Sequence, residues 1–367
     1  MNGTSFVPSP DALPLPAPEP LLRFLLLLTF LLHLLAMNGL LGGALLALWS
    51  RLRSRAPHDL HATLAARIGH LLPTFVAGTV TFGVAPLLFL QALYGRWFFT
   101  SSVLMGWPWL AIVPLVTLAY YGVYLESFRR ERLGRLRTPL LAAVSLLLAA
   151  VALIYTHNAT LMLRPQTWAT AYFARPGGGN LNFGDPQVLP RWLHMVLGAT
   201  AVAGLLVAWW GEALRRRDAA ASAFMRAHGL TALGAVTMAN FLVGMWFLIA
   251  LPRPVMLGFM GGSGHATGLF GAGLLLTLVL IALAMRARGR PDASLRPVTA
   301  VALLTLVVMV LMRDHVRAAM LATTDGPAAA VAVRTQALNI ALFALLLVGA
   351  GLTVWWMVRQ LARGAAD

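Results

Sequence analysis

Residues 164–210 read RPQTWATAYFARPGGGNLNFGDPQVLPRWLHMVLGATAVAGLLVAWW, a polar loop rich in Gly, Pro and Asn that runs directly into an apolar helix. One imidazole, His194, lies just inside the start of that helix. In hydrocarbon, only protein or a cofactor can hydrogen-bond or ligate an imidazole, so a histidine within a membrane span marks a candidate functional site. The stretch therefore predicts a membrane-spanning helix and a functional residue together.

The composition extends this prediction to the whole chain. Hydrophobic residues make up 59% of the 367 residues, charged residues make up 11%, and the mean hydropathy is +0.77. Soluble domains of this size do not have that balance, whereas a bilayer core demands apolar spans of about 20 residues. The sequence predicts nine such spans: 21–48, 68–93, 103–125, 139–156, 192–211, 227–251, 266–285, 298–322 and 336–358. We therefore expect an all-α, polytopic, integral membrane helical bundle.

The positive charge predicts the orientation of the bundle. All 28 basic residues are arginines, and the formal net charge is +16. Nineteen of the arginines follow spans 1, 3, 5, 7 and 9, which makes those connections cytoplasmic by the positive-inside rule. This placement predicts a multi-pass protein of the bacterial inner membrane, with its N-terminus outside and its C-terminus in the cytoplasm. It does not suggest nucleic-acid binding.

The expected organisation has three parts. Residues 1–20 contain six prolines and predict an extended external tail. Residues 21–358 form the transmembrane bundle, with 157–191 as an external loop, and 359–367 form a cytoplasmic tail. Glycines such as Gly39, Gly42 and Gly204 permit close contact between helices.

The chain has no cysteine. Disulfides, thiolate-bound metals, iron–sulfur clusters and covalently attached haem are therefore excluded. Any redox cofactor must be held without covalent attachment, by His, Met or acidic side chains.

Histidines within the spans are the first candidate ligands. His33 lies deep in the first span, where a neutral imidazole needs a partner, either haem iron or a carbonyl or hydroxyl of a neighbouring helix. His194, His265 and His157 are expected at similar external depth, so two of them could be the axial ligands of one haem. The alternative is that these helix-end histidines are interfacial. His70 and His228 form a second possible pair near the cytoplasmic side.

The segment MRDHVRAAML, 312–321, places charge inside an apolar helix. Each charge costs about 2.5–3.5 kcal/mol at mid-membrane on insertion scales. Arg313 and Arg317 share a helix face, and Asp314 can pair with Arg317. The two arginines would suit cofactor carboxylates such as haem propionates, and the alternative is a buried structural ion network.

Glu126, in AYYGVYLESFRR at the cytoplasmic end of the third span, is a further candidate. It is either a proton-path carboxylate or an interfacial acid paired with Arg129 or Arg130.

Several segments, in order, resemble subunit I of the cytochrome bd quinol oxidases, a family with nine spans and an external N-terminus. They are HLLAMNGLLGG (33–43), ALYGRWFFTSSVLMGWPWLAIVPLVTLAYYGVYLES (92–127), PRWLHMVLGA (190–199) and MRAHGLTALGAVTMANFLVG (225–244). The resemblance implies that His33 and His194 are haem-ligating histidines and that Glu126 corresponds to the family's proton-path glutamate. In RDHVR, Asp314 and Arg317 would correspond to an acidic haem ligand and the Arg that follows it.

The chain departs from that family after the sixth span. Only LPRPVMLGFMGGSG (251–264) stands where the family has its long quinol-binding loop, and the family's GRQPW motif is absent. The seventh span lacks the Arg-x-Met that supplies the second low-spin ligand. His265 would have to substitute, since Leu269 stands at the nearest position.

These observations predict a haem-b-binding electron-transfer subunit of a respiratory complex that oxidises quinol. His194 and His265 would be axial ligands, His33 with Asp314 or His315 would hold a further haem, and the two arginines would bind propionates. The missing loop and motifs favour electron delivery to a partner membrane subunit and a cytochrome or other redox subunit over oxygen reduction. The alternatives are a proton-coupled transporter and a membrane anchor subunit without haem.

Overall fold

The structure is a computed structural model that describes residues 10, 13–56, 59–322 and 332–364, with the backbone alone at 354, 357–358 and 360–364. Over these ranges it contains no β-strand and the following helices: α1 Glu19–Arg53, α2 Leu60–Leu104, α3 Gly106–Phe128, α4 Arg130–Leu133, η1 Gly134–Leu136, α5 Arg137–Met162, η2 Pro165–Thr167, α6 Trp168–Ala174, α7 Val188–Ala213, α8 Ala219–Ala250, α9 Arg253–Leu257, the π-helix η3 Gly258–Gly262, α10 Gly264–Arg288, α11 Arg296–Ala322 and α12 Ala337–Gly364.

Eight helical segments of the described chain are long and apolar enough to cross a membrane. They are α1, α2, α3, α4 to α5, α7, α8, α10 and α11. The predicted all-α polytopic bundle is therefore confirmed. The ninth predicted span falls on α12, whose apolar stretch Ala337–Thr353 is shorter.

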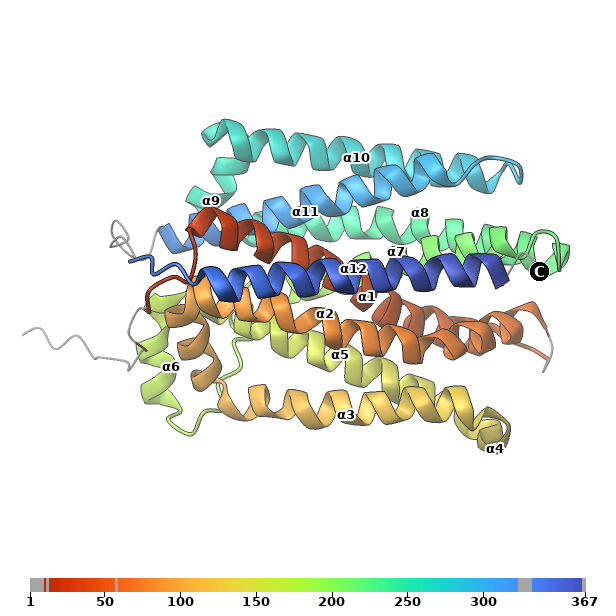
Figure 1. The fold of residues 1–367 in the computed structure, drawn as a ribbon, viewed down its shortest axis with the longest axis horizontal. Coiled ribbons are helices and arrows are strands. Elements are labelled where there is room, and N and C mark those ends of the chain that lie inside the picture. The colour runs from red at the N-terminus through yellow and green to blue at the C-terminus, as the bar shows by residue number, and fades with distance from the viewer. Residues whose placement is uncertain (1–9, 11–12, 57–58, 323–331, 365–367) are drawn as a thin grey trace, which may run out of the picture.

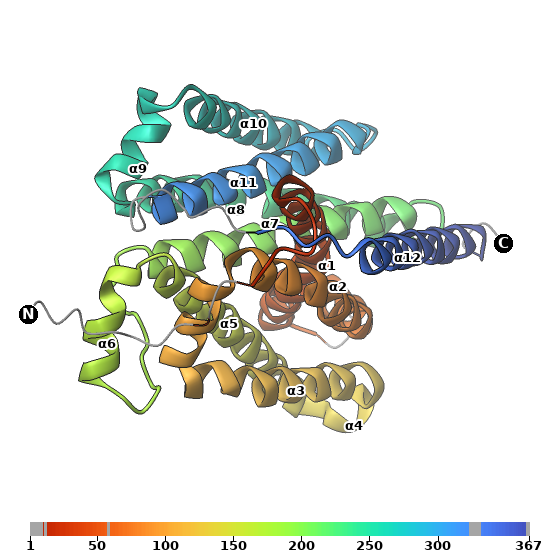
Figure 2. The ribbon, with the colours of Figure 1, turned by 60° about the vertical axis from the view of Figure 1, so that its left-hand side comes forward.

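The long helices lie side by side along one axis (Figure 1), which gives the bundle two ends. The arginine-rich end carries α4, the turns that join α1 to α2, α7 to α8 and α10 to α11, and the last turns of α12. The opposite end, called the α9 end below, carries α6, α9 and the first turns of α7 and α10. Figure 2 shows the same separation after rotation. The predicted basic connections thus meet at one end of the molecule, as a positive-inside arrangement requires.

Polar side chains mark where two helices begin at the arginine-rich end. The Asp59 carboxylate accepts a hydrogen bond from the backbone N–H of Ala62 at 2.6 Å, and Asp218 accepts from Ala221 at 2.9 Å. Each caps an otherwise unpaired N–H of the first helical turn. The caps fix the starts of α2 and α8, two of the helices that begin at the arginine-rich end.

Helices α1 and α7 occupy the middle of the bundle. α1 packs against α2 and α7, and α7 packs against α8, with small residues at each crossing. A Cβ at Gly42 would collide with the backbone of Ala199 on α7, and Gly204 approaches α8 at Gly229 just as closely. The predicted use of glycines for close helix contact is confirmed, since only their lack of a side chain allows these backbones to meet.

Gly204→Ala tests this contact. The new Cβ would lie 2.7 Å from the Gly229 carbonyl oxygen and 2.9 Å from the Leu233 nitrogen, both of them backbone atoms that cannot rotate away. We expect a loss of about 1–3 kcal/mol in unfolding free energy, measured by denaturation in one detergent. Gly271→Ala on α10 is the control, because no atom lies within 4 Å of its Cβ. Equal effects of the two substitutions would contradict the close packing.

The second helix is longer than the predicted span 68–93. It continues to Leu104 through residues 94–102, which lie between the predicted spans 68–93 and 103–125, with a kink at Tyr94 (φ −129°, ψ 28°). Side-chain hydroxyls in the last turns bond back to the helix: Ser101 and Ser102 both donate to the Phe98 carbonyl oxygen, at 2.9 and 2.7 Å. The hydroxyls are thus satisfied within the helix, so these polar residues need no turn to find hydrogen-bond partners.

The connection 157–191 is only partly irregular. Its first residues belong to α5, which ends at Met162, and its middle forms η2 and α6. The connection between α8 and α10 is likewise structured, as α9 followed by one π-helical turn. Both structured connections lie at the α9 end.

The N-terminal and C-terminal parts of the chain meet at the α9 end. The Leu15 N–H donates to the Ala332 carbonyl oxygen at 2.8 Å, and the Arg334 N–H donates to the Leu15 carbonyl oxygen at 2.9 Å. Leu15 is buried, with 7% of its surface exposed. The described residues 13–18 therefore lie outside any helix and pack against the residues that precede α12.

Candidate functional site

The predicted site residues divide between the two ends of the bundle. The structure places Glu126 near the arginine-rich end of α3. All the others lie on the half of the bundle nearer the α9 end: His33 on α1, His194 on α7, His265 on α10, and Arg313, Asp314, His315 and Arg317 on α11.

His33 lies about 21 Å along α1, counted at 1.5 Å per residue from Glu19. Its Nδ1 is 3.0 Å from the Thr79 carbonyl oxygen of α2. A carbonyl only accepts, so Nδ1 must carry the proton and donate it. In the neutral ring this leaves a lone pair on Nε2. The carbonyl partner considered from the sequence is thus present, and it leaves the second nitrogen free to act as a ligand.

Glycine makes room for this ring. A Cβ at Gly83, one turn beyond Thr79, would lie 3.0 Å from His33 Cε1 and 3.1 Å from Nδ1. The imidazole therefore rests directly against the backbone of α2, and its orientation is fixed by that contact and the hydrogen bond.

His194 is held in a similar way by α8. A Cβ at Gly244 would lie 3.3 Å from His194 Cε1 and 3.5 Å from Nδ1. The Nδ1 atom is buried near the Asn240 backbone carbonyl oxygen and makes no hydrogen bond of good geometry. The Asn240 side-chain oxygen is also buried without a partner. Buried polar atoms of this kind usually have a partner, so the surroundings of His194 and Asn240 leave hydrogen-bonding capacity unused.

The depths of the two imidazoles follow from the contact between α1 and α7. These helices run in the same direction and touch at Gly42 and Ala199. His33 precedes that level by nine residues and His194 by five, so His33 lies about 6 Å nearer the α9 end.

His157 has no free ring nitrogen with which to ligate haem iron. Its Nδ1 accepts a hydrogen bond from the backbone N–H of Asn182 at 3.1 Å. A backbone N–H only donates, so the proton of the neutral ring lies on Nε2, which is buried without a partner. The Phe183 ring packs edge-on against it with centroids 4.4 Å apart. His157 thus anchors the segment that leads into α7.

His265 lies beside His315. Their ring centroids are 5.8 Å apart, and Phe259 of the π-helix packs edge-on against His315 at 5.3 Å. Among the ring contacts of the described residues, none joins His265 to His194. The structure therefore pairs His265 with His315, and not with His194 as we predicted.

Two arginines lie near these histidines without a carboxylate partner. Arg313 stacks over the Phe30 ring at 4.1 Å, and Arg191 lies over Phe247 at 5.0 Å. Within the described chain, no carboxylate comes within 4.0 Å of either guanidinium. Arg313 lies near both the Arg191 guanidinium and the His33 ring. Its side chain is exposed on the bundle. The region therefore concentrates positive charge that the protein does not neutralise.

Asp314 belongs to a separate ion network. Its Oδ2 accepts from Arg23 of α1, with Nε at 2.6 Å and Nη2 at 2.5 Å, and its Oδ1 pairs with Arg317. The Arg317 guanidinium also lies over the Tyr94 ring at 4.6 Å, at the kink of α2. Both carboxylate oxygens are used, so Asp314 is not free to ligate a metal. The structural ion network considered from the sequence is present for Asp314 and Arg317.

Glu126 is buried, with 2% of its surface exposed. It pairs with Arg137 at the start of α5, with Nη2 to Oε1 at 2.7 Å, and not with Arg129 or Arg130 as we expected. The reason is the fold: η1 returns the chain so that α5 begins beside the end of α3. Next to it, His70 Nδ1 lies 3.0 Å from the Ser127 hydroxyl.

Haem b fits the donor set of the α9 half. Two imidazoles lie against glycines, one with a free Nε2 and one with an unpaired Nδ1, and two guanidiniums lack carboxylates. Haem offers an iron that imidazole nitrogens ligate and two propionates whose negative charges match the two guanidiniums. No cluster of three or more His, Asp or Glu that would hold a bare metal ion occurs in the described part of the chain.

Comparison with known proteins returned no match to any family model and no match to any curated protein.

Four residues of this region were not singled out from the sequence: Thr79, Arg191, Asn240 and Arg23. Arg191 had a detectable signal, because it precedes His194 by three residues and so shares its helix face. Arg23 is likewise a charge inside an apolar run, EPLLRFLLLL. Thr79 contributes a backbone oxygen, which any residue carries, so no sequence signal identifies it.

Proposed function

We propose that this protein is a haem-b-binding membrane electron-transfer subunit of a bacterial respiratory complex, a divergent relative of cytochrome bd subunit I that oxidises quinol. One observation carries the proposal: His33, deep within α1, donates from Nδ1 to the Thr79 carbonyl oxygen and keeps the Nε2 lone pair free. A metal-ligating histidine usually donates a hydrogen bond from its other ring nitrogen to a group such as a backbone carbonyl. This hydrogen bond fixes the ring and raises its basicity.

His33 and His194 would hold haem iron. The 6 Å difference in depth and their separate glycine supports on α2 and α8 allow them to serve one macrocycle or two. Bound haem b would supply a one-electron redox centre between quinol and a partner subunit.

Arg313 and Arg191 would bind the propionates. An unpaired guanidinium among apolar helices is costly, and the nearby aromatic rings of Phe30 and Phe247 offset only part of that cost. An anionic group beside the two guanidiniums would offset the rest and would fix the orientation of the bound ring.

His265 and His315 would lie where quinol is oxidised and would accept its protons. Both lie at the α9 end, which the arginine distribution predicts to be external, and His265 is exposed. Quinol loses two protons with its two electrons, and an exposed imidazole there is a base that can accept one of them and release it to the outside. We assign electron delivery to a partner cytochrome or other redox subunit, because the chain lacks the family's long loop, its Arg-x-Met and its GRQPW motif, so any quinol site must be built elsewhere.

A visible spectrum tests the proposal. Protein expressed with haem supplied and purified in detergent should show a dithionite-reduced minus oxidised spectrum of b-type haem. A water-soluble quinol should reduce the same haem. A colourless protein would contradict the proposal. If such a protein also carried proton-driven solute uptake in liposomes, the transporter alternative would take its place.

A further inference from the structure

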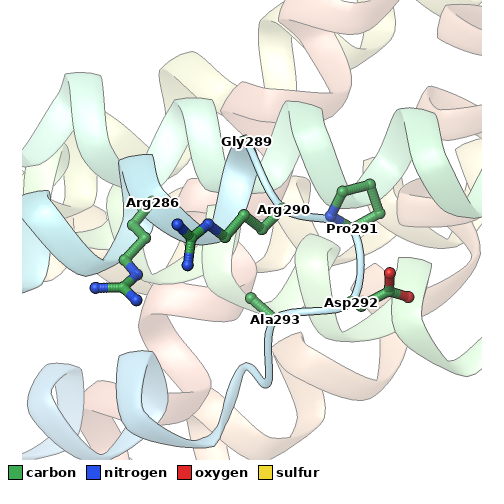
Figure 3. A pocket seen from close by; sticks show the side chains of 6 residues that line it. All are labelled: Arg286, Gly289, Arg290, Pro291, Asp292 and Ala293. Carbon is green, nitrogen blue, oxygen red and sulfur yellow. The ribbon is translucent and has the colours of Figure 1, made fainter.

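A pocket at the arginine-rich end is separate from the region described above. It is formed by the turn between α10 and α11 and has a volume of about 550 Å³. Its lining residues are Arg286, Gly289, Arg290, Pro291, Asp292 and Ala293 (Figure 3). Pockets of this size accept small ligands or the headgroup of a lipid.

The charge within the pocket is unbalanced. The guanidiniums of Arg286 and Arg290 extend to the same side of the turn in Figure 3, while the Asp292 carboxylate points away from them. Asp292 is instead paired with Arg215 of the neighbouring turn. Among the ion pairs of the described residues, none involves Arg286 or Arg290. Two free cations therefore face one opening.

Polar contacts hold the turn in place from the α7–α8 side. Arg226 of α8 binds Glu212 at 2.5 Å and donates to the Ala293 carbonyl oxygen. Glu212 also accepts from Arg215 at 3.4 Å. The arginine that neutralises Asp292 is thus fixed to the same network, and the pocket is preorganised before any ligand arrives.

The position of the pocket selects its ligand. It lies where α10 leaves the membrane, and the exposed residues Leu278 and Ala282 share a helix face with Arg286 at steps of four. This apolar face leads from the guanidiniums into the hydrocarbon region. A free phosphate would use only the charged part of this surface, whereas a phospholipid would use both parts.

We propose that this pocket binds the phosphate of an anionic phospholipid headgroup, held by Arg286 and Arg290 with its acyl chains along α10. Guanidinium groups match phosphate oxygens in geometry and charge, and arginines next to a membrane helix attract anionic lipids. The proposal is independent of haem binding.

The test is lipid titration of the delipidated full-length protein, followed by native mass spectrometry. Arg286→Gln/Arg290→Gln should weaken binding of phosphatidylglycerol by about tenfold or more. The matched control is Arg132→Gln/Arg135→Gln, which removes the same charge from exposed positions at the same end. The control should bind as the unmodified protein does.

Three outcomes of these titrations would overturn the proposal, and a comparison with a second lipid supplies a fourth. They are equal affinity in the pocket variant, equal weakening in the control, and displacement of phosphatidylglycerol by millimolar inorganic phosphate, which would identify a site for a soluble anion. Phosphatidylcholine has the same phosphate without net negative charge, so binding as tight as that of phosphatidylglycerol would also contradict it.

Discussion

Asp314→Ala is expected to lower the unfolding free energy by about 3–5 kcal/mol, because it leaves the buried Arg317 guanidinium without its carboxylate. The Asp314 and Arg317 side chains are 4% and 8% exposed. The loss should be visible as a lower denaturation midpoint in one detergent. Removing both partners, as in Asp314→Leu/Arg317→Met, should recover most of it, because no uncompensated charge is then left inside.

Arg23→Gln is the matched comparison. Its side chain is 42% exposed, and Asp314 keeps Arg317 when Arg23 is lost. We expect a cost of about 1 kcal/mol. If Asp314→Ala costs no more than Arg23→Gln, the network does not stabilise the α9 end in the way described.

His194→Ala is expected to remove a haem from the protein. The substitution takes away the imidazole but leaves Gly244 and Asn240 in place, so the helices should still pack. Haem content per chain, measured as the pyridine haemochrome, should fall by at least about tenfold. Loss of a residue that only supports a metal ligand already costs about tenfold or more in affinity, so loss of the ligand itself should cost at least as much.

His70→Ala is the control for that experiment. His70 is an exposed imidazole near the arginine-rich end, bound to Ser127. It should keep full haem content. Retention of haem by His194→Ala, with the protein eluting as a folded species in gel filtration, would contradict the assignment of His194.

The sequence predicted the helices better than the contacts between them. Long apolar runs report burial in lipid, which is a local property, so the bundle and its basic end could be predicted. The pairing of Arg23 with Asp314 joins residues 291 positions apart, and no local pattern encodes which of several arginines a carboxylate meets. The same limit explains Glu126, whose partner depends on the direction in which the chain turns after α3.

The histidines show what the residue type alone does not predict, namely which ring nitrogen carries the proton. His33, His157 and His194 are alike in the sequence as imidazoles close to apolar residues. They differ in what Nδ1 faces: a carbonyl at Thr79, an N–H at Asn182, and no well-placed partner for His194. Those neighbours are backbone groups of other segments, so the protonation of each ring is a property of the fold and not of the residue.

The hydrogen bonds between Leu15 and the segment that precedes α12 have a consequence for biogenesis. Ribosomal synthesis delivers Leu15 long before residues 332–334, so Leu15 stays without these backbone partners until the helices between them have been made. The contact between the two segments therefore forms late in assembly. A chain that stops before residue 332 would leave the N–H and the carbonyl oxygen of Leu15 without their partners.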